Sequence, residues 1–298
     1  MEYYESVIRL SFFTGVLLLM ALWEALAPRR PRTVRKPLRW FSNLGLVALN
    51  SVTARLVPFL GLTGIAVLAE ARGWGLFHNL SLPAWLAVAL SVVVLDFAIY
   101  LQHVMFHAVP VLWRLHRVHH TDLDFDVTTG VRFHTLEILL SLVIKAAVVL
   151  LLGAPALAVL VFEVLLNATS LFNHGNVRLP AWLDQMLRLF VVTPEMHRVH
   201  HSVLVRETNS NFGFNLPWWD YLLATYKAQP AKGHEGMTIG LNQYREEWVE
   251  HLHWMLLLPF FGGVSDYPIN QRGKGSGETE SGATQAVSPA VSGQHMEM

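Results

Sequence analysis

Long apolar stretches constrain the fold of this chain more than any other feature of its sequence. Residues 10–27, 84–101 and 136–172 are each long enough to cross the hydrocarbon core of a bilayer as helices, and 44–69 is a further candidate that Pro58 is expected to kink. The chain is 53% hydrophobic and only 15% charged, which is more apolar than soluble domains usually are. The first stretch lacks the cleavage pattern of a signal peptide, so we expect a retained anchor. The sequence therefore predicts an all-α integral membrane helical bundle.

The charges between the apolar stretches predict on which side of the membrane each loop lies. Segment 28–43 carries six bases and no acid, so the positive-inside rule places it in the cytoplasm. Segment 70–83 has one base and one acid and is expected outside. A Gly-Ala-Pro sequence at 153–155 interrupts the last apolar stretch, which predicts a helical hairpin whose two ends lie on the same side. The model that follows is a multi-pass protein with its polar cap, residues 202–263, in the cytoplasm.

Net charge and cysteine content exclude several classes of function. The net charge is +0 and the isoelectric point is near 7.3, so the strongly basic surface that binds nucleic acid is absent. Because the chain has no cysteine, it cannot hold a disulfide, a thiolate-ligated haem or a cysteine-ligated iron–sulfur cluster. Any transition metal must therefore be bound by nitrogen or oxygen.

Histidine is the residue whose placement is most informative. The chain has 15 histidines, and ten of them lie between His103 and His201. Three motifs space their histidines so that the rings of each motif project from one face of a helix. Two of the motifs are the same pentapeptide, His-Arg-Val-His-His. The motif histidines are His103 and His107, then His116, His119 and His120, and finally His197, His200 and His201.

Together these motifs predict a metal centre. A single histidine is most often a hydrogen-bonded structural residue, but eight imidazoles packed together without an ion would leave many ring nitrogens unpaired. A duplicated three-histidine motif is the pattern expected for two similar metal ions side by side. The predicted topology brings all three motifs to the cytoplasmic face. His174, at the end of the hairpin, can complete the set, whereas His134 stays open between a ligand, a partner of a ligand and a structural residue.

These residues resemble the signature of the sterol desaturase and fatty acid hydroxylase superfamily. The resemblance covers residues 82–226 and includes the His-x-x-x-His motif, both His-x-x-His-His motifs and the segment 209–213 after the third motif. It implies a di-iron centre that activates dioxygen, with the eight motif histidines and His174 as ligands. The chain departs from fatty acid 2-hydroxylases at Ser170, which stands where a further histidine is expected, and in the three residues inside its first motif.

The resemblance also divides the chain into three parts. Residues 1–81 are expected to hold the N-terminal membrane anchors and the basic loop. Residues 82–263 correspond to the hydroxylase-like catalytic domain, with a transmembrane helix, the helical hairpin and a mostly helical cap. Residues 264–298 are rich in Gly, Ser and Thr without apolar periodicity, so we expect a disordered tail.

Two acidic residues, together with His134, are candidates for a supporting catalytic role. Neutral ligands leave the charge of two ions uncompensated, so nearby acids should matter. Asp96 lies seven residues before His103, inside an apolar span where a carboxylate is costly unless it serves a site. A hydrogen bond to Tyr100 or to a neighbouring helix is the alternative for Asp96. Glu137, three residues after His134, is expected to orient a ring nitrogen.

The resemblance implies the dioxygen-dependent hydroxylation or desaturation of an unactivated C–H bond in a lipid or sterol-like substrate. Two other interpretations stay open. A metal transporter or sensor without catalysis is disfavoured, because the rings gather at one membrane face rather than along a transmembrane path. An oxygenase of the same superfamily that acts on ether lipids or carotenoids fits the sequence equally well.

The electrons for this reaction are predicted to come from a separate protein. The chain has no cysteine for an iron–sulfur cluster and no Gly-x-Gly-x-x-Gly motif between a strand and a helix for a nicotinamide or flavin. We expect a ferredoxin or cytochrome b5 with its reductase, docking on arginines beside the histidine motifs; pairing with local acids or lipid phosphates is the alternative for each arginine. These arginines are Arg114, Arg117, Arg132, Arg198 and Arg206.

Lys145 and Glu163 are two charges inside the predicted hairpin. Both lie at similar distances from its turn at 153–155, and are therefore level to within about 1.5 Å along the helices. The sequence predicts an ion pair across the hairpin.

Overall fold

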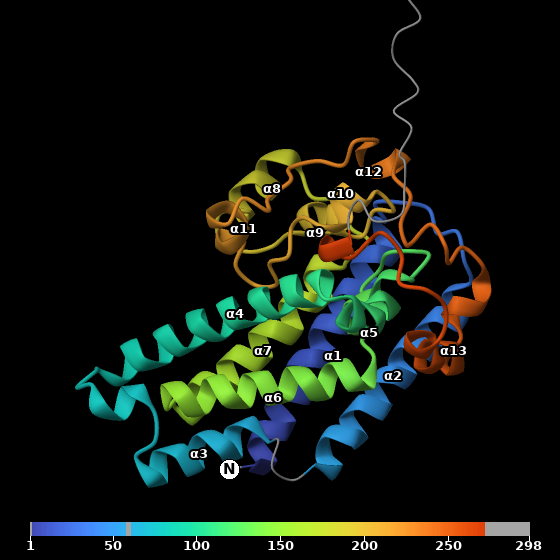
Figure 1. Cartoon of the computed structure of the whole chain (residues 1–298). Coiled ribbons are helices and arrows are strands. Elements are labelled where there is room, and N and C mark those ends of the chain that lie inside the picture. The colour runs from blue at the N-terminus through green and yellow to red at the C-terminus, as the bar shows by residue number, and fades with distance from the viewer. Residues whose placement is uncertain (1, 58–60, 272–298) are drawn as a thin grey trace, which may run out of the picture.

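The computed structural model describes residues 2–57 and 61–271, which form helices and no β-strand (Figure 1). The longer helices are α1 (Glu2–Leu26), α2 (Lys36–Leu56), α3 (Leu62–Arg72), α4 (Ala84–Ala108), α5 (Pro110–His120), α6 (Thr135–Leu152) and α7 (Ala156–Asn173). The shorter ones are α8 (Ala181–Leu187), α9 (Pro194–His200), α10 (Val205–Thr208), α11 (Trp218–Leu222), α12 (Gly233–Gly236) and α13 (Leu252–Leu257). The 3-10 helices are η2 (Leu76–Asn79), η3 (Thr129–Val131), η4 (Glu247–Glu250), η5 (Leu258–Phe260) and η6 (Ile269–Gln271).

Four of these helices are long and apolar enough to cross a membrane. They are Tyr4–Leu26 in α1 and the whole of α4, α6 and α7. The predicted spans at 10–27, 84–101 and 136–172 are thereby confirmed as helices, and with them the all-α bundle. Figure 1 shows the long helices packed side by side, with α8 to α12 gathered over one end of them.

The predicted span at 44–69 needs correction. It is divided between α2, which ends at Leu56, and α3, which begins at Leu62, and neither is among the four candidate spans. Pro58, the expected cause of a kink, lies outside the described residues. Helix α2 buries polar side chains rather than a continuous apolar stripe, because Asn43 and Asn50 face the interior and hydrogen-bond the segment before α6.

The turn of the hairpin forms where the sequence predicts it. Gly153 ends α6 in the left-handed conformation with φ of 65°, and Pro155 precedes α7. Gly75, in the loop before η2, approaches this turn so closely that a Cβ there would lie 2.1 Å from the nitrogen of Gly153. Only glycine fits at that contact, which fastens the end of the hairpin to the loop between α3 and α4.

The predicted ion pair across the hairpin is confirmed. Lys145 Nζ lies 3.3 Å from Glu163 Oε1, and both side chains are only 10% exposed. The structure adds a third member, because Arg9 of α1 contacts the other carboxylate oxygen of Glu163. Arg9 also pairs with Glu5 at 2.5 Å. The charge that crosses the hairpin is therefore shared with the first helix.

Because Glu163 pairs with both Lys145 and Arg9, we expect the removal of Glu163 and the removal of Lys145 to lower the free energy of unfolding by different amounts. Glu163→Gln should destabilise the protein by about 3–5 kcal/mol, because it leaves the buried Lys145 without an anionic partner. Lys145→Met should cost less, since Glu163 keeps Arg9. The double variant should be more stable than the sum of the two single losses implies, as thermal unfolding in detergent would measure. Additive losses, or a larger loss for Lys145→Met, would contradict the arrangement.

The basic segment 28–43 packs against the cap instead of forming a free loop. Arg29 Nε lies 2.9 Å from Glu195 Oε1, and Arg30 donates to the carbonyl of Met237 at 2.6 Å. Arg39 is fully buried between acids of the segment that follows α5. The placement of this segment in the cytoplasm remains a prediction, but several of its charges have structural partners.

The end of the fold also differs from the predicted boundary at residue 263. Tyr267 is buried, and its ring stacks on Trp113 at a centroid distance of 5.7 Å. Helix η6 extends the described chain to Gln271. Residues 264–271 therefore belong to the fold, whereas the rest of the predicted tail, residues 272–298, lies outside the described residues.

Candidate metal centre

Helix ends position the candidate ligands. Helix α4 carries the first histidine motif in its last turns. Helix α5 ends in one of the identical pentapeptides, and α9 ends within the other, whose last residue, His201, is its C-terminal cap. Both α5 and α9 begin with a proline, Pro110 and Pro194, in their first turn. His174 is the C-terminal cap of α7. The ends of α4, α5, α7 and α9 thus point at one place.

All nine histidines predicted as ligands meet there in two groups, each with its nitrogens within 4.8 Å of one another. Every ring is buried. One group contains His103, His107, His116, His120 and His200, and the other contains His119, His174, His197 and His201. We call them the five-histidine group and the four-histidine group.

The two pentapeptides interlock between the groups. Each pentapeptide gives ligands to both groups. In the α5 motif, His116 and His120 are four residues apart and share the five-histidine group, while His119 faces the other. In the α9 motif, His200 alone reaches the five-histidine group. Each group therefore draws histidines from both α5 and α9.

In the five-histidine group, hydrogen bonds on the outer nitrogen, Nδ1, of three rings determine which nitrogen of each ring carries the proton. His103 Nδ1 donates to the carbonyl of Phe212 at 2.7 Å, and His200 Nδ1 donates to that of Ser210 at 2.7 Å. His107 Nδ1 lies 3.1 Å from Asn209 Oδ1, whose amide is oriented by its bond to another backbone carbonyl. Since carbonyl oxygens only accept, these three neutral rings carry their proton on Nδ1. Their Nε2 lone pairs are free.

The Nε2 lone pairs of the five-histidine group converge, and too few N–H donors lie near them to form hydrogen bonds with all of them. His103 Nε2 lies 3.1 Å from His116 Nε2, and His107 Nε2 lies 3.1 Å from His120 Nε2. His200 Nε2 has no hydrogen-bond partner among the described residues. Lone pairs brought this close repel one another unless a cation lies between them, so the donor set fits a transition metal.

In the four-histidine group, too, ring nitrogens without donors face one another. His174 Nδ1 donates to the carbonyl of Ser170 at 2.7 Å, which leaves its Nε2 free to face the group. That Nε2 lies 3.2 Å from His119 Nε2 and 3.1 Å from His197 Nε2. Neither nitrogen of His201 has a partner in the described part of the chain. Ser170, which replaces an expected histidine, thus supports a ligand through its backbone carbonyl.

Burial keeps these rings in the form that binds metal. It lowers the pKa of His116 and of His174 to about 3. Burial, reinforced by neighbouring histidines, also holds the pKa values of His120 and His201 well below their ordinary range. A neutral imidazole offers a lone pair, whereas a protonated ring cannot bind a cation.

Glu137 orients the ring of a candidate ligand, but that ring is not the ring of His134, its neighbour in sequence. Its Oε1 lies 2.6 Å from Nδ1 of His116, one of the five-histidine group. The sequence predicted that Glu137, three residues after His134, orients a ring nitrogen; the ring belongs to His116, whereas His134 bonds to Leu256. A carboxylate on the outer nitrogen fixes the ring and makes its inner nitrogen a stronger ligand.

His134 and Asp96 do not reach either group. His134 Nδ1 accepts from the backbone nitrogen of Leu136 and caps α6, while its Nε2 donates to the carbonyl of Leu256 at 3.1 Å. Asp96 accepts from Trp219 Nε1 at 2.7 Å and from two backbone nitrogens, and it does not bond to Tyr100. Asp96 therefore holds the segment whose carbonyls orient the ligands.

Residues 209–220 support the centre in a way that the sequence did not reveal. Asp220 accepts from the backbone nitrogens of Phe212 and Gly213 at 2.8 Å, which fixes the carbonyl that orients His103. The segment 209–213 was noticed as part of a motif, and Asn209 meets His107 with its side chain, but His103 and His200 are oriented by backbone carbonyls. Side-chain identity gives no signal for this backbone role.

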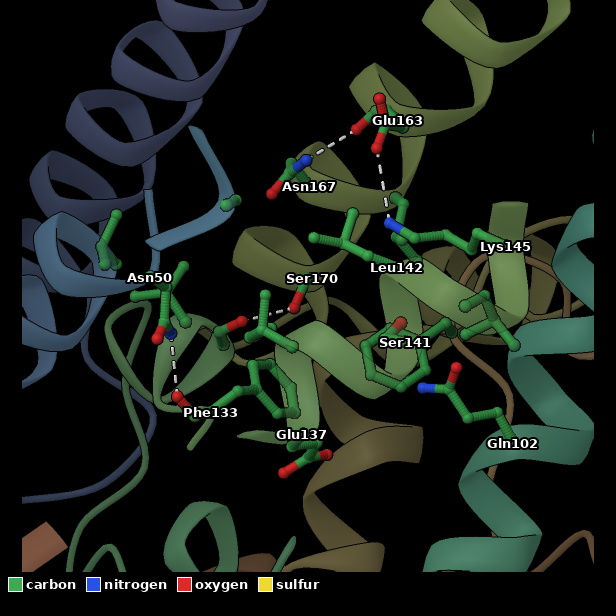
Figure 2. A pocket seen from close by; sticks show the side chains of 18 of the residues that line it. Asn50, Gln102, Phe133, Glu137, Ser141, Leu142, Lys145, Glu163, Asn167 and Ser170 are labelled. Atoms are coloured by element: carbon green, nitrogen blue, oxygen red, sulfur yellow. Dashed lines mark hydrogen bonds and ion pairs between the residues drawn. The ribbon is translucent and has the colours of Figure 1, made fainter. Parts of the chain in front are cut away.

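A cavity of about 340 Å³ opens directly from the five-histidine group. His103, His116 and Glu137 line one end of it, and Lys145 and Glu163 line another part. It lies between α2, α4, α6 and α7, as Figure 2 shows. Much of its wall is apolar, with Ile99, Phe106, Phe133, Leu142, Leu166 and Phe214. The centre is therefore buried from water but open to an apolar molecule between the helices.

Comparisons with known proteins agree with this geometry. The family model described as Fatty acid hydroxylase matches residues 88–225, which include all nine candidate ligands. The chain is 29% identical over 236 residues to the ornithine lipid hydroxylase OlsE of Rhizobium tropici, a match that covers 76% of this chain and 70% of the relative. It is 25% identical over 268 residues to the alkylglycerol monooxygenase of Homo sapiens, covering 84% of this chain.

The matches differ in extent. The chain spans 57% of the length of the human relative. The fatty acid hydroxylase vlmA of a Lecanicillium species is 28% identical over 166 residues, which cover 48% of this chain and 42% of the relative. No solved structure matches the chain significantly.

Proposed function

Because the chain belongs to the fatty acid hydroxylase family through residues 88–225, we propose that it uses dioxygen to oxidise an unactivated C–H bond of a lipid at two histidine-bound iron ions. The observation that carries this proposal is the convergence of free Nε2 lone pairs beside an apolar cavity. Imidazole suits iron, copper and zinc alike, so the choice of iron rests on the family. The relatives are named for hydroxylating an ornithine lipid or a fatty acid and for oxygenating an alkylglycerol, which supports a lipid substrate.

In this proposal the protein positions and shields the reacting groups. The five-histidine group would hold one iron and the four-histidine group the other, and bound iron would supply the activation of dioxygen. Glu137 keeps His116 aimed inward, and the carbonyls of Phe212 and Ser210 do the same for His103 and His200. The cavity brings a substrate carbon beside His103 and His116, where apolar walls exclude water.

Two alternatives compete with this proposal. A metal transporter or sensor must release its ion, whereas all nine rings are buried and several are held by hydrogen bonds on their outer nitrogens. An ether-lipid oxygenase remains a second candidate, because alkylglycerol monooxygenase is among the relatives. The cytoplasmic location of the centre rests on the basic segment 28–43 and stays a prediction.

A separate electron donor remains part of the proposal, but the docking surface predicted from arginines needs correction. Arg117, Arg132 and Arg198 are fully buried, and each donates to backbone carbonyls. Arg206 is exposed, and Arg114 is half-buried against the loop after η5. The buried arginines cannot meet a ferredoxin or cytochrome b5. Turnover of purified protein with NADH alone would refute the need for a donor.

The decisive experiment compares the lipids of cells with and without the gene by mass spectrometry. We expect a lipid that gains one oxygen or loses two hydrogens only when the intact gene is present. Cells that produce His200→Ala protein, which lacks a ligand but keeps the fold, should resemble cells without the gene. Identical lipid profiles in all three strains, with the protein present in the membrane, would overturn the proposal.

A further inference from the structure

The cavity beside the metal centre has a polar region that the chemistry at the histidines does not use. Lys145 of α6 and Glu163 and Asn167 of α7 line it, and Figure 2 shows these side chains grouped away from Glu137. Lys145 is only 8% exposed. Burying polar side chains on the wall of a cavity between apolar helices costs free energy unless a ligand forms hydrogen bonds with them.

The charges of this region balance one another. Lys145 and Arg9 supply two positive charges, and Glu163 and Glu5 supply two negative charges. Glu163 uses one oxygen for Lys145 and the other for Arg9. An ionised ligand would add a buried charge without a partner, so the region suits a ligand group that is polar but uncharged.

Hydrogen-bonding capacity is left over at two positions on the cavity wall. An ammonium group has three donors, and in the described part of the chain Lys145 has one partner, Glu163. Gln102 of α4 lines the same cavity, and its buried Oε1 has no partner among the described residues. The lysine can donate to a carbonyl or hydroxyl oxygen. The amide oxygen of Gln102 can accept from a hydroxyl or N–H group.

The position of Lys145 along α6 sets how far a ligand group bound to it lies from the metal centre. Lys145 lies eight residues after Glu137 on α6, which corresponds to about 12 Å along the helix. Glu137 in turn contacts His116 of the five-histidine group. A ligand bound at both places would have an apolar stretch of about this length between its polar group and the carbon beside the histidines.

We propose that Lys145, supported by Glu163, binds an uncharged hydrogen-bonding group of the lipid substrate, such as an ester or amide carbonyl. This inference rests on the proposed function and specifies its substrate class. The preferred substrate is then an amphiphile whose polar group lies about 12 Å from the carbon that is oxidised. Free fatty acid anions and plain hydrocarbons fit the site less well.

The test measures binding, so that it does not depend on turnover. Native mass spectrometry of the purified protein would compare methyl hexadecanoate, hexadecane and hexadecanoate as probes. We expect the wild type to prefer the ester, and Lys145→Met to weaken ester binding about tenfold while leaving hexadecane unchanged. Lys145→Arg keeps the charge and the donors and should retain the preference.

Val143→Met is the matched control, because it places the same side chain on the same helix at a position that is 51% exposed. It should bind all three probes like the wild type. If Lys145→Met does not fold, Lys145→Met/Glu163→Gln carries the same comparison, since Arg9 keeps Glu5. Equal losses for ester and hexadecane, unchanged ester binding in the lysine variant, or tightest binding of hexadecanoate would overturn the subsite. An unchanged lipid profile in cells would overturn the proposed oxidation instead.

Discussion

Replacing His200 with alanine should lower bound iron and reduce lipid oxidation at least about 100-fold, while the protein still inserts into the membrane. His200 is the one ligand that α9 gives to the five-histidine group, and its Nε2 faces the other free nitrogens without a protein partner in the described chain. The same outcome is expected for each of the nine grouped histidines. Iron content by plasma emission spectroscopy, measured beside turnover, checks the prediction.

His134→Ala provides the contrast. His134 caps α6 and bonds to Leu256, outside both groups, so its loss should cost about 1 kcal/mol of stability and leave the iron content unchanged. If His134→Ala lost iron while His200→Ala kept it, the arrangement of the two groups would be wrong. A uniform loss of iron in both variants would indicate a general folding defect instead.

Arg39→Met should destabilise the fold by about 3–5 kcal/mol. Arg39 is fully buried and contacts both oxygens of Asp122 at 2.7 and 2.8 Å and Asp126 at 2.7 Å. Removing it leaves two buried carboxylates without this partner, in the segment that follows His120. Thermal unfolding in detergent would measure the loss.

The loss should also depend on pH. Burial opposes ionisation of Asp126, but Arg39 and the hydrogen bonds from Thr128 together outweigh it and lower the pKa of this carboxyl to about 2, so in the wild type the stabilisation is present above the ordinary pKa and lost as pH falls toward 2. Without Arg39, burial should raise the pKa, and mild acid should then protonate the carboxyl and relieve part of the defect. Arg35→Met is the matched control, since Arg35 is 84% exposed, and it should be nearly neutral at every pH. A pH-independent loss in Arg39→Met would contradict this account.

The sequence predicted the grouping of the motif histidines well because their spacing is local. An interval of three or four residues on a helix places rings together whatever the rest of the fold does, so the eight motif histidines could be named, and His174 was added from its place at the end of the hairpin. The hairpin and the Lys145–Glu163 pair were predictable for the same reason, since one turn sets the register of both helices. These features need only short-range geometry.

The remaining errors concern contacts between distant segments. The interlocking of the two pentapeptides depends on how α5 faces α9, which spacing within either motif does not reveal. Arg39 was interpreted as a loop charge, although it pairs with acids more than eighty residues away. The arginines beside the histidine motifs were expected to form a docking surface for an acidic carrier, yet Arg132 and Arg198 are buried. Pairing of this kind is decided by tertiary packing.

The division of ligands between the two groups has a consequence for biosynthesis. Residues 103–120 contain four members of the five-histidine group, but only one member of the four-histidine group. Because a ribosome delivers the chain from its N-terminus, most of the first group exists before the α6–α7 hairpin has been made. The second group gains His174 only when the hairpin is complete, and the remaining rings follow in α9. The first group is thus nearly assembled before the hairpin is made, the second depends on the hairpin for His174, and both are completed only by α9, which supplies His200 to the first and His197 to the second.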